Sequence, residues 1–229
     1  MYVTRKTLRY AAVPAALIWS LPAQAQTRDH APVSLQSARQ MAQDAPGTES
    51  WTYAKPIGVF QKYRSLIVDP TTVYQGPDAQ FEGIDYATRS KFAAIITEEM
   101  RLELAKSFPA PARPQADTMR MKITMLGAQK TVGGLATATR VTPLGFATSA
   151  LKSALGKKGS LTGSVLYAVE LYDARTNELL LAAVRRRTPD PLDVPATLST
   201  TDTVKAVARE LADGARKRLE DLTGVRGPQ

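Results

Sequence analysis

Residues 163–187, GSVLYAVELYDARTNELLLAAVRRR, contain the strongest structural signal in the chain. Two apolar, β-prone runs, Gly163–Tyr172 and Glu178–Arg187, flank the pentapeptide Asp173–Asn177. Aspartate at the start of a turn accepts hydrogen bonds from the backbone that follows it, and asparagine tolerates the left-handed conformation that a type I turn with a bulge requires. The stretch therefore predicts a β-hairpin.

Two further strands are predicted upstream of this hairpin. Thr118–Leu126 alternates between apolar and polar residues, which is typical of a strand with one face in the core and one in water. Tyr63–Val68 is a short β-prone run that stops at Asp69 and Pro70, because proline cannot continue a strand ladder.

Helical periodicity replaces strand alternation in three places. Residues 85–108 place Phe92, Ile96, Met100 and Leu104 on one face and end before three prolines. A final helix opens at Ser199, whose spacing to Asp202 resembles a capping box, and ends at Gly224. Its apolar residues form a single stripe: Val204, Val207, Ala208, Leu211, Ala215, Leu219 and Leu222. Small apolar residues at helical spacing also predict a short helix over 144–155.

The resulting order, β-α-β-(α)-β-β-α, predicts an α+β fold in two layers. We expect a single small mixed sheet of three to four strands with helices packed mainly on one face. Residues 51–229 are predicted to form one domain, and residues 26–50 an irregular tail with at most a short helix. The order of the strands in the sheet stays open.

The first 25 residues have the layout of a secretory signal peptide. Arg5, Lys6 and Arg9 precede an apolar run at 10–21, and the small-residue triplet 23–25 follows it. A bilayer span needs roughly 20 apolar residues, so this run is too short to be one. The pattern predicts cleavage after Ala25, a periplasmic or secreted location, and no transmembrane segment in the mature chain.

Composition excludes several kinds of chemistry. The 229 residues include no cysteine, which rules out disulfides, thiolate nucleophiles and cysteine-ligated metal clusters. The single histidine, His30, lies in the predicted tail, where nothing would position it for catalysis. The net charge of +9 falls to +6 without the signal segment. We therefore expect no cofactor, no enzyme activity and no nucleic-acid binding, but an attraction toward anionic envelope components.

Basic residues near the predicted hairpin form the first candidate site. They are Lys152, Lys157, Lys158, Arg185, Arg186 and Arg187. If they meet in space, they could bind an anionic envelope polymer or a partner protein. Successive strand residues alternate faces, so at most two of the three arginines can point the same way. The competing interpretation is a solvated strand end whose charges discourage edge pairing.

An acidic pair forms the second candidate site. Glu99 and Glu103 lie one helical turn apart and could share a proton or hold a hard cation. Used with a further carboxylate in a cleft, they could hydrolyse a glycan or peptidoglycan. Alternatively, they form an exposed rim that Arg101 and Lys106 neutralise.

Three stretches together resemble a known family. They are Lys62–Tyr74, Gly156–Val165 and Glu170–Leu179, and the similarity extends from about Trp51 to Leu222. They resemble the bacterial envelope proteins grouped as domain of unknown function 3313, many of which are small lipoproteins. The resemblance implies an envelope location and an α/β fold, but no reaction. This chain lacks the lipobox cysteine of many members, and Asn177 stands where a glycine is usual in the hairpin.

Three functions are consistent with these observations. The leading hypothesis is a non-enzymatic accessory protein of the cell envelope that acts by surface contact with an envelope component or partner protein. The alternatives are a hydrolase that uses acidic residues, and a carrier of a small apolar ligand held between the 144–155 helix and the sheet. The identity of the partner, the oligomeric state and the process served stay open.

Overall fold

The computed structural model describes residues 31–129, 163–188 and 199–227, apart from residues 33, 49 and 82. The strands in these ranges are β1 (Ala42–Gln43), β2 (Trp51–Ala54), β3 (Ser65–Val68), β4 (Thr72–Val73), β5 (Thr118–Gln129), β6 (Ser164–Asp173) and β7 (Leu179–Arg187). The α-helices are α1 (Tyr86–Leu104) and α4 (Thr200–Thr223), and two 3-10 helices occur at η1 (Ala38–Gln40) and η2 (Ile57–Lys62). The predicted signal segment and the predicted helix over 144–155 lie outside the described residues.

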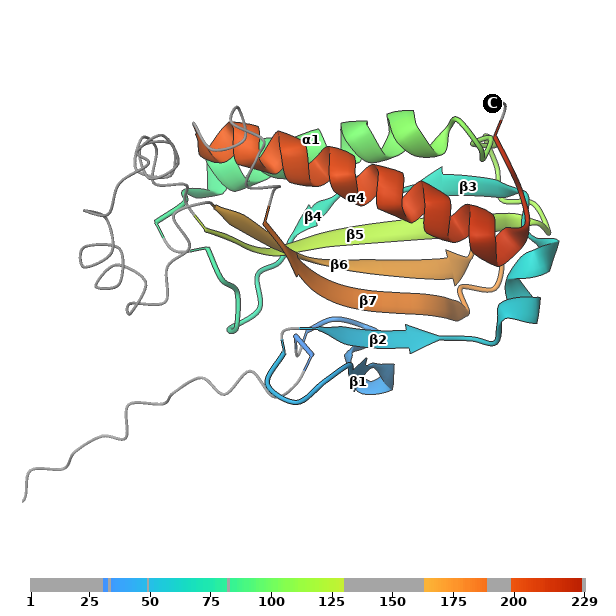
Figure 1. The fold of residues 1–229 in the computed structure, drawn as a ribbon, viewed down its shortest axis with the longest axis horizontal. Coiled ribbons are helices and arrows are strands. Elements are labelled where there is room, and N and C mark those ends of the chain that lie inside the picture. The colour runs from blue at the N-terminus through green and yellow to red at the C-terminus, as the bar shows by residue number, and fades with distance from the viewer. Residues whose placement is uncertain are drawn as a thin grey trace, which may run out of the picture.

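All seven strands belong to one mixed sheet (Figure 1). Its order is β1-β2-β7-β6-β5-β3, and β4 pairs with β5 beside β3. β3 and β4 run parallel to β5, and every other pair is antiparallel. The prediction of a mixed α+β sheet is confirmed, but the prediction of three to four strands is wrong. β1 and β4 were missed because two residues are too few to show alternation, and the four-residue β2 was missed as well.

The predicted hairpin is confirmed as β6 and β7, which pair antiparallel. The Asp173 carboxylate accepts hydrogen bonds from the backbone N–H groups of Arg175 and Thr176 at 2.9 and 3.0 Å. Asn177 adopts a φ of 58°, the left-handed conformation predicted for it. Local turn chemistry therefore determines how β7 returns along β6.

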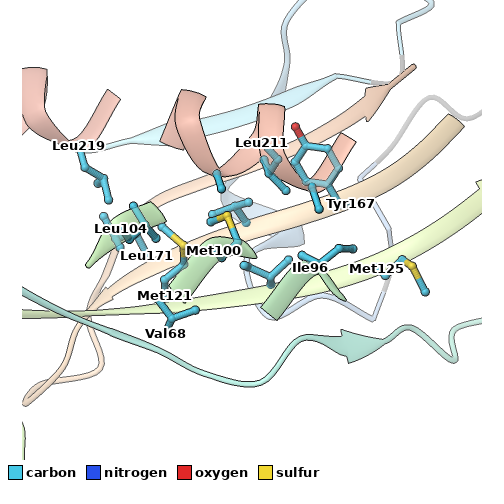
Figure 2. Packing of buried hydrophobic residues seen from close by; sticks show 14 of the residues in the cluster. Val68, Ile96, Met100, Leu104, Met121, Met125, Tyr167, Leu171, Leu211 and Leu219 are labelled. Carbon is cyan, nitrogen blue, oxygen red and sulfur yellow. The ribbon is translucent and has the colours of Figure 1, made fainter. Parts of the chain in front are cut away.

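Both helices pack on one face of the sheet and enclose the main core. Asp85 caps α1 by accepting from the Thr88 N–H at 2.9 Å, and Ser199 caps α4 by accepting from the Asp202 N–H at 3.1 Å. Gly224 ends α4 with a φ of 74°. Figure 2 shows how side chains from both helices and from β5 and β6 interlock in this core. The predicted apolar faces of both helices are thus confirmed.

The opposite face of the sheet is covered in part by the residues that precede β2. A smaller cluster joins this segment to the strands, and its buried members are Ala31, Leu35, Trp51, Tyr74, Leu126, Leu166, Ala168 and Val184. The Ser37 N–H also donates to the Glu170 carboxylate of β6 at 3.1 Å. As a result β6 is buried along its whole length, whereas Arg120, Lys122 and Thr124 of β5 stay half-buried. Residues 31–50 thus include η1 and β1 and lie against the sheet.

Candidate functional site

The three consecutive arginines of β7 point to both faces of the sheet. Arg185 and Arg187 lie on the helix-bearing face, where they line a groove beside α4. Arg186 lies on the opposite face, where it donates to the Ser164 hydroxyl at 3.0 Å and also bonds Gln80. The alternation therefore limits a shared surface to two of the three, as the sequence predicted. Lys152, Lys157 and Lys158 lie outside the described residues.

The groove lies between α4 and β7, and we call it the α4–β7 groove. Its volume is about 210 Å³. Apolar side chains form its floor: Met121, Tyr167, Val169, Leu171, Leu181, Ala183, Leu211, Ala215 and Leu219. Arg185, Arg187, Glu210 and Arg218 form its rim, together with the backbone of Gly214. Three cationic side chains and one carboxylate give this rim an excess of positive charge.

The groove exists because the helix layer ends before the sheet does. Leu181 and Ala183 of β7 face the helix side but stay half-buried, whereas the corresponding residues of β6 are buried. Each helix covers about two strands, since packed helices lie 8–10 Å apart and neighbouring strands about 4.8 Å apart. Two helices therefore leave the β7 side of this face open in the described part of the chain.

Tyr167 links the floor of the groove to its rim. Its ring lies beside Leu211, with the phenol oxygen turned away from the rest of the cluster (Figure 2). The residue is only 3% exposed, and burial raises the pKa of Tyr167, against the opposing effect of a hydrogen bond from Arg187. The phenol is therefore protonated at neutral pH, and the Arg187 guanidinium lies close enough to act on it. Sequence reasoning missed Tyr167, because a tyrosine within a buried strand looks like any other core residue.

Arg185 is fixed by contacts with the edge of the sheet. Its guanidinium donates to the Trp51 carbonyl at 2.8 Å and to the Thr52 hydroxyl at 2.6 Å, and it pairs with the Asp44 carboxylate at 2.9 Å. Arg187 and Arg218, in contrast, are exposed. These last two arginines are the rim cations best placed to meet an incoming anion.

Gly214 is an exposed glycine in the middle of α4, at the lip of the groove. A Cβ built there would meet no other atom within 4 Å. Glycine inside a helix costs about 0.5–1 kcal/mol relative to alanine. Its position therefore leaves the groove open at some cost to the helix.

We expect Gly214→Ala to raise the free energy of unfolding by about 0.5–1 kcal/mol, because alanine restricts the unfolded chain and clashes with nothing. Urea denaturation followed by circular dichroism would measure the change. Gly224→Ala is the matched control and should change stability in the opposite direction, since its φ of 74° disfavours a side chain. A loss of stability in Gly214→Ala would contradict this account of α4.

The acidic pair lies at the seam between the two helices. Glu103 of α1 pairs with Lys106 at 2.5 Å and with Arg216 of α4 at 2.7 Å. Hydrogen bonds from Lys106 and then Arg216 lower the pKa of Glu103. Glu99 pairs with Arg209 of α4 at 3.4 Å. Both carboxylates thus act as partners that join α1 to α4, an arrangement that does not favour a general acid.

Arg216 is the centre of this seam, since it also pairs with Glu220 at 2.9 Å and with Asp213 at 3.0 Å. We expect Arg216→Met to lower the free energy of unfolding by about 2 kcal/mol, because the buried Glu220 carboxylate would lose its nearer cation and keep only Arg226 at 3.9 Å. Arg209→Met should cost under about 0.5 kcal/mol, since the Arg209 side chain is 68% exposed. Equal effects of the two changes in urea denaturation would show that the seam does not depend on Arg216.

Two other clefts offer less chemistry. The larger, about 860 Å³, lies between α1 and β4, and its Arg101 already donates twice to the Val68 carbonyl at the edge of β3. The other, about 490 Å³, lies on the opposite face and reaches Glu170. Oε1 of that carboxylate accepts from the Ser37 N–H and the Tyr172 hydroxyl, both at 3.1 Å, and so fixes the N-terminal segment.

No group of three or more histidine, cysteine, aspartate or glutamate side chains that could hold a metal ion occurs among the residues that the structure describes. Within those same residues, neither α-helix is long and apolar enough to cross a membrane.

The chain matches the family described as "Protein of unknown function (DUF3313)" over residues 33–215. It therefore belongs to that family, which confirms the resemblance noted in the sequence. No curated protein matches it.

Two solved structures illustrate what the chain resembles. The PelC dodecamer from Paraburkholderia phytofirmans matches at 16% identity and a TM-score of 0.38, over 79% of this chain and 98% of that one. A presumed lipoprotein from Caulobacter crescentus CB15 matches at 16% identity and a TM-score of 0.31, over 73% of this chain and 93% of that one. At such scores neither likeness bears on function.

Proposed function

We propose that this protein is an exported, non-enzymatic accessory of the cell envelope that acts by surface contact with an anionic partner at the α4–β7 groove. The observation that carries the proposal is the combination of an apolar floor and an arginine-bearing rim on a strip of the sheet that the described helices leave open. The signal-like segment at residues 1–25 supports the export.

The rim favours an anionic partner for an electrostatic reason. Arg187 and Arg218 are exposed, so their charges act on whatever approaches the groove. Arginine binds carboxylates and phosphates through two parallel hydrogen bonds, which makes such contacts specific as well as attractive. Contacts of this kind weaken as salt screens them, so the association should depend on ionic strength.

The alternative function, a hydrolase that uses acidic residues, has no comparable groove or cluster to support it in the described part of the chain. Glu99 and Glu103 are each held by an arginine of α4, and no lining residue of the α4–β7 groove other than Glu210 carries a carboxylate. A glycosidase mechanism needs two carboxyl groups facing one substrate. The described residues therefore give hydrolysis no specific support.

The test compares how charge variants of the full chain are retained on isolated envelopes. We expect Arg187→Gln with Arg218→Gln to reduce retention at least fivefold at low salt, and high salt to release the unmodified protein. Lys91→Gln with Lys205→Gln is the matched control, because it removes the same charge from exposed helix positions that do not line the groove. Equal retention of both double variants would contradict the proposal.

A further inference from the structure

We infer that the α4–β7 groove binds a free monoacyl carboxylate, with the carboxylate at Arg187 and the alkyl chain under α4 toward Arg218. This inference rests on the proposed function and names the chemistry of the anionic partner.

The groove is small, and most of its lining is apolar. Its floor reaches from Leu181 and Ala183 of β7, across Val169 of β6, to Met121 of β5 beneath the helix. A volume of 210 Å³ lies below the roughly 300–1,000 Å³ of sites for drug-sized molecules. An unbranched alkyl chain fits a space of this volume, whereas a packed helix needs more room.

The length of the groove suggests the length of the chain. Along α4 its lip runs from Glu210 to Arg218, which is about 12 Å at 1.5 Å per residue and matches roughly ten extended carbons. Gly214 lies midway along this lip and presents no side chain that would narrow the entrance. The small side chains of Ala183 and Ala215 leave further space on either side.

The rim determines which end of an amphiphile stays outside. Arg185 and Arg187 lie at the Tyr167 end of the groove and Arg218 at the Leu181 end, and Glu210 is the one carboxylate among the lining residues. Arg187 lies near Tyr167 of the apolar floor, since its guanidinium acts on the pKa of that phenol. An anionic head with an apolar tail therefore matches the groove at both ends, whereas a neutral or cationic head matches it only at the tail.

Methionine methyl resonances provide a direct test on the full-length protein. The chain has six methionines; Met121 lines the groove, whereas Met100, Met119 and Met125 lie elsewhere in the core. We expect decanoate to shift the ¹³C-methyl signal of Met121 saturably and to leave the other three almost unchanged. Decanol and decyltrimethylammonium, which have the same chain, should bind at least about tenfold more weakly.

Chain length and two variants sharpen the test. From hexanoate to decanoate, affinity should rise about three- to fourfold per methylene, and it should level off once the chain outgrows the groove. Gly214→Trp should abolish the Met121 shift by filling the groove, and Arg187→Gln should weaken decanoate binding about tenfold. Lys91→Gln with Lys205→Gln should bind decanoate as the unmodified protein does.

Three outcomes would overturn the inference. One is no Met121 shift with any alkyl carboxylate, and another is equal binding of decanoate and decanol. The third is binding of phosphatidylglycerol vesicles that depends on Arg187 and Arg218 without any response of Met121 to decanoate. That last result would show that the groove contacts a lipid surface rather than a free ligand, and the proposed function would stand. The proposed function itself fails only if the charge variants are retained normally on envelopes.

Discussion

Replacing Asp173 with alanine is expected to lower the free energy of unfolding by about 3–5 kcal/mol. The carboxylate is 5% exposed and accepts from the Tyr63 hydroxyl at 2.8 Å, besides its two turn N–H groups. Its removal would leave the phenol of Tyr63, a fully buried residue, without a hydrogen-bond acceptor. It would also remove the two hydrogen bonds that stabilise the β6–β7 turn. The same change thus disturbs two parts of the sheet.

Urea denaturation of a small series would separate these contributions. Asp173→Asn keeps one acceptor oxygen for the turn and should cost less than Asp173→Ala. Tyr63→Phe removes only the buried donor and should cost about 1 kcal/mol. An Asp173→Ala protein within 1 kcal/mol of the unmodified one would contradict the role assigned to this carboxylate.

The contribution of Asp173 should also depend on pH. Burial alone would raise its pKa, but hydrogen bonds from Thr176, Tyr63 and Arg175 hold the pKa well below the ordinary value of 3.8. A folded-state pKa below the unfolded value stabilises the protein fully above the unfolded pKa, and this stabilisation is lost as the pH falls below about 4. The difference in stability between the unmodified protein and Asp173→Ala should therefore shrink from pH 4 downward.

Replacing Met100 with alanine is expected to cost about 2–5 kcal/mol, because a fully buried side chain would leave a cavity between α1 and the sheet. Figure 2 shows Met100 inside the core cluster. The same experiment on Leu102 is the matched control on the same helix, since Leu102 is 63% exposed. Leu102→Ala should change stability by under about 0.5 kcal/mol, and Met100→Leu by under about 1.5 kcal/mol. A cost for Met100→Ala close to that for Leu102→Ala would show that α1 does not pack as described.

The elements that the sequence predicted correctly are those that local chemistry determines. The turn at Asp173–Asn177, the cap at Ser199 and the end at Gly224 each depend on residues a few positions apart. The apolar stripes of both helices and the alternation of β5 likewise reflect fixed periods of 3.6 and 2 residues. These features could be derived before any contact between distant residues was known.

The features that the sequence could not predict depend on such distant contacts. β2 is only four residues long and becomes a strand because β7 offers it a free edge. The segment before it lies on the sheet because Trp51 and Leu35 meet Leu166 and Val184 there. No local sequence pattern in residues 31–50 indicates that they contact these strands.

The candidate site likewise has features that the sequence predicted and features that it could not predict. Alternation along a strand predicted that at most two of Arg185–Arg187 share a face, and it required no tertiary information. The groove itself arises from where α4 lies over the sheet, so neither Tyr167 nor Gly214 could be connected with those arginines in advance. The acidic pair was recognised, but its partners Arg209 and Arg216 come from a helix about 110 residues away in sequence.

In-cell photo-crosslinking tests most directly whether the α4–β7 groove is the contact surface. A benzoylphenylalanine in place of Arg218 would lie on the rim of the groove, and one in place of Lys91 would lie on the exposed side of α1. We predict a defined adduct with an envelope component from the first position and none from the second. A protein recovered free of adducts from both positions, or crosslinked equally from both, would contradict the account.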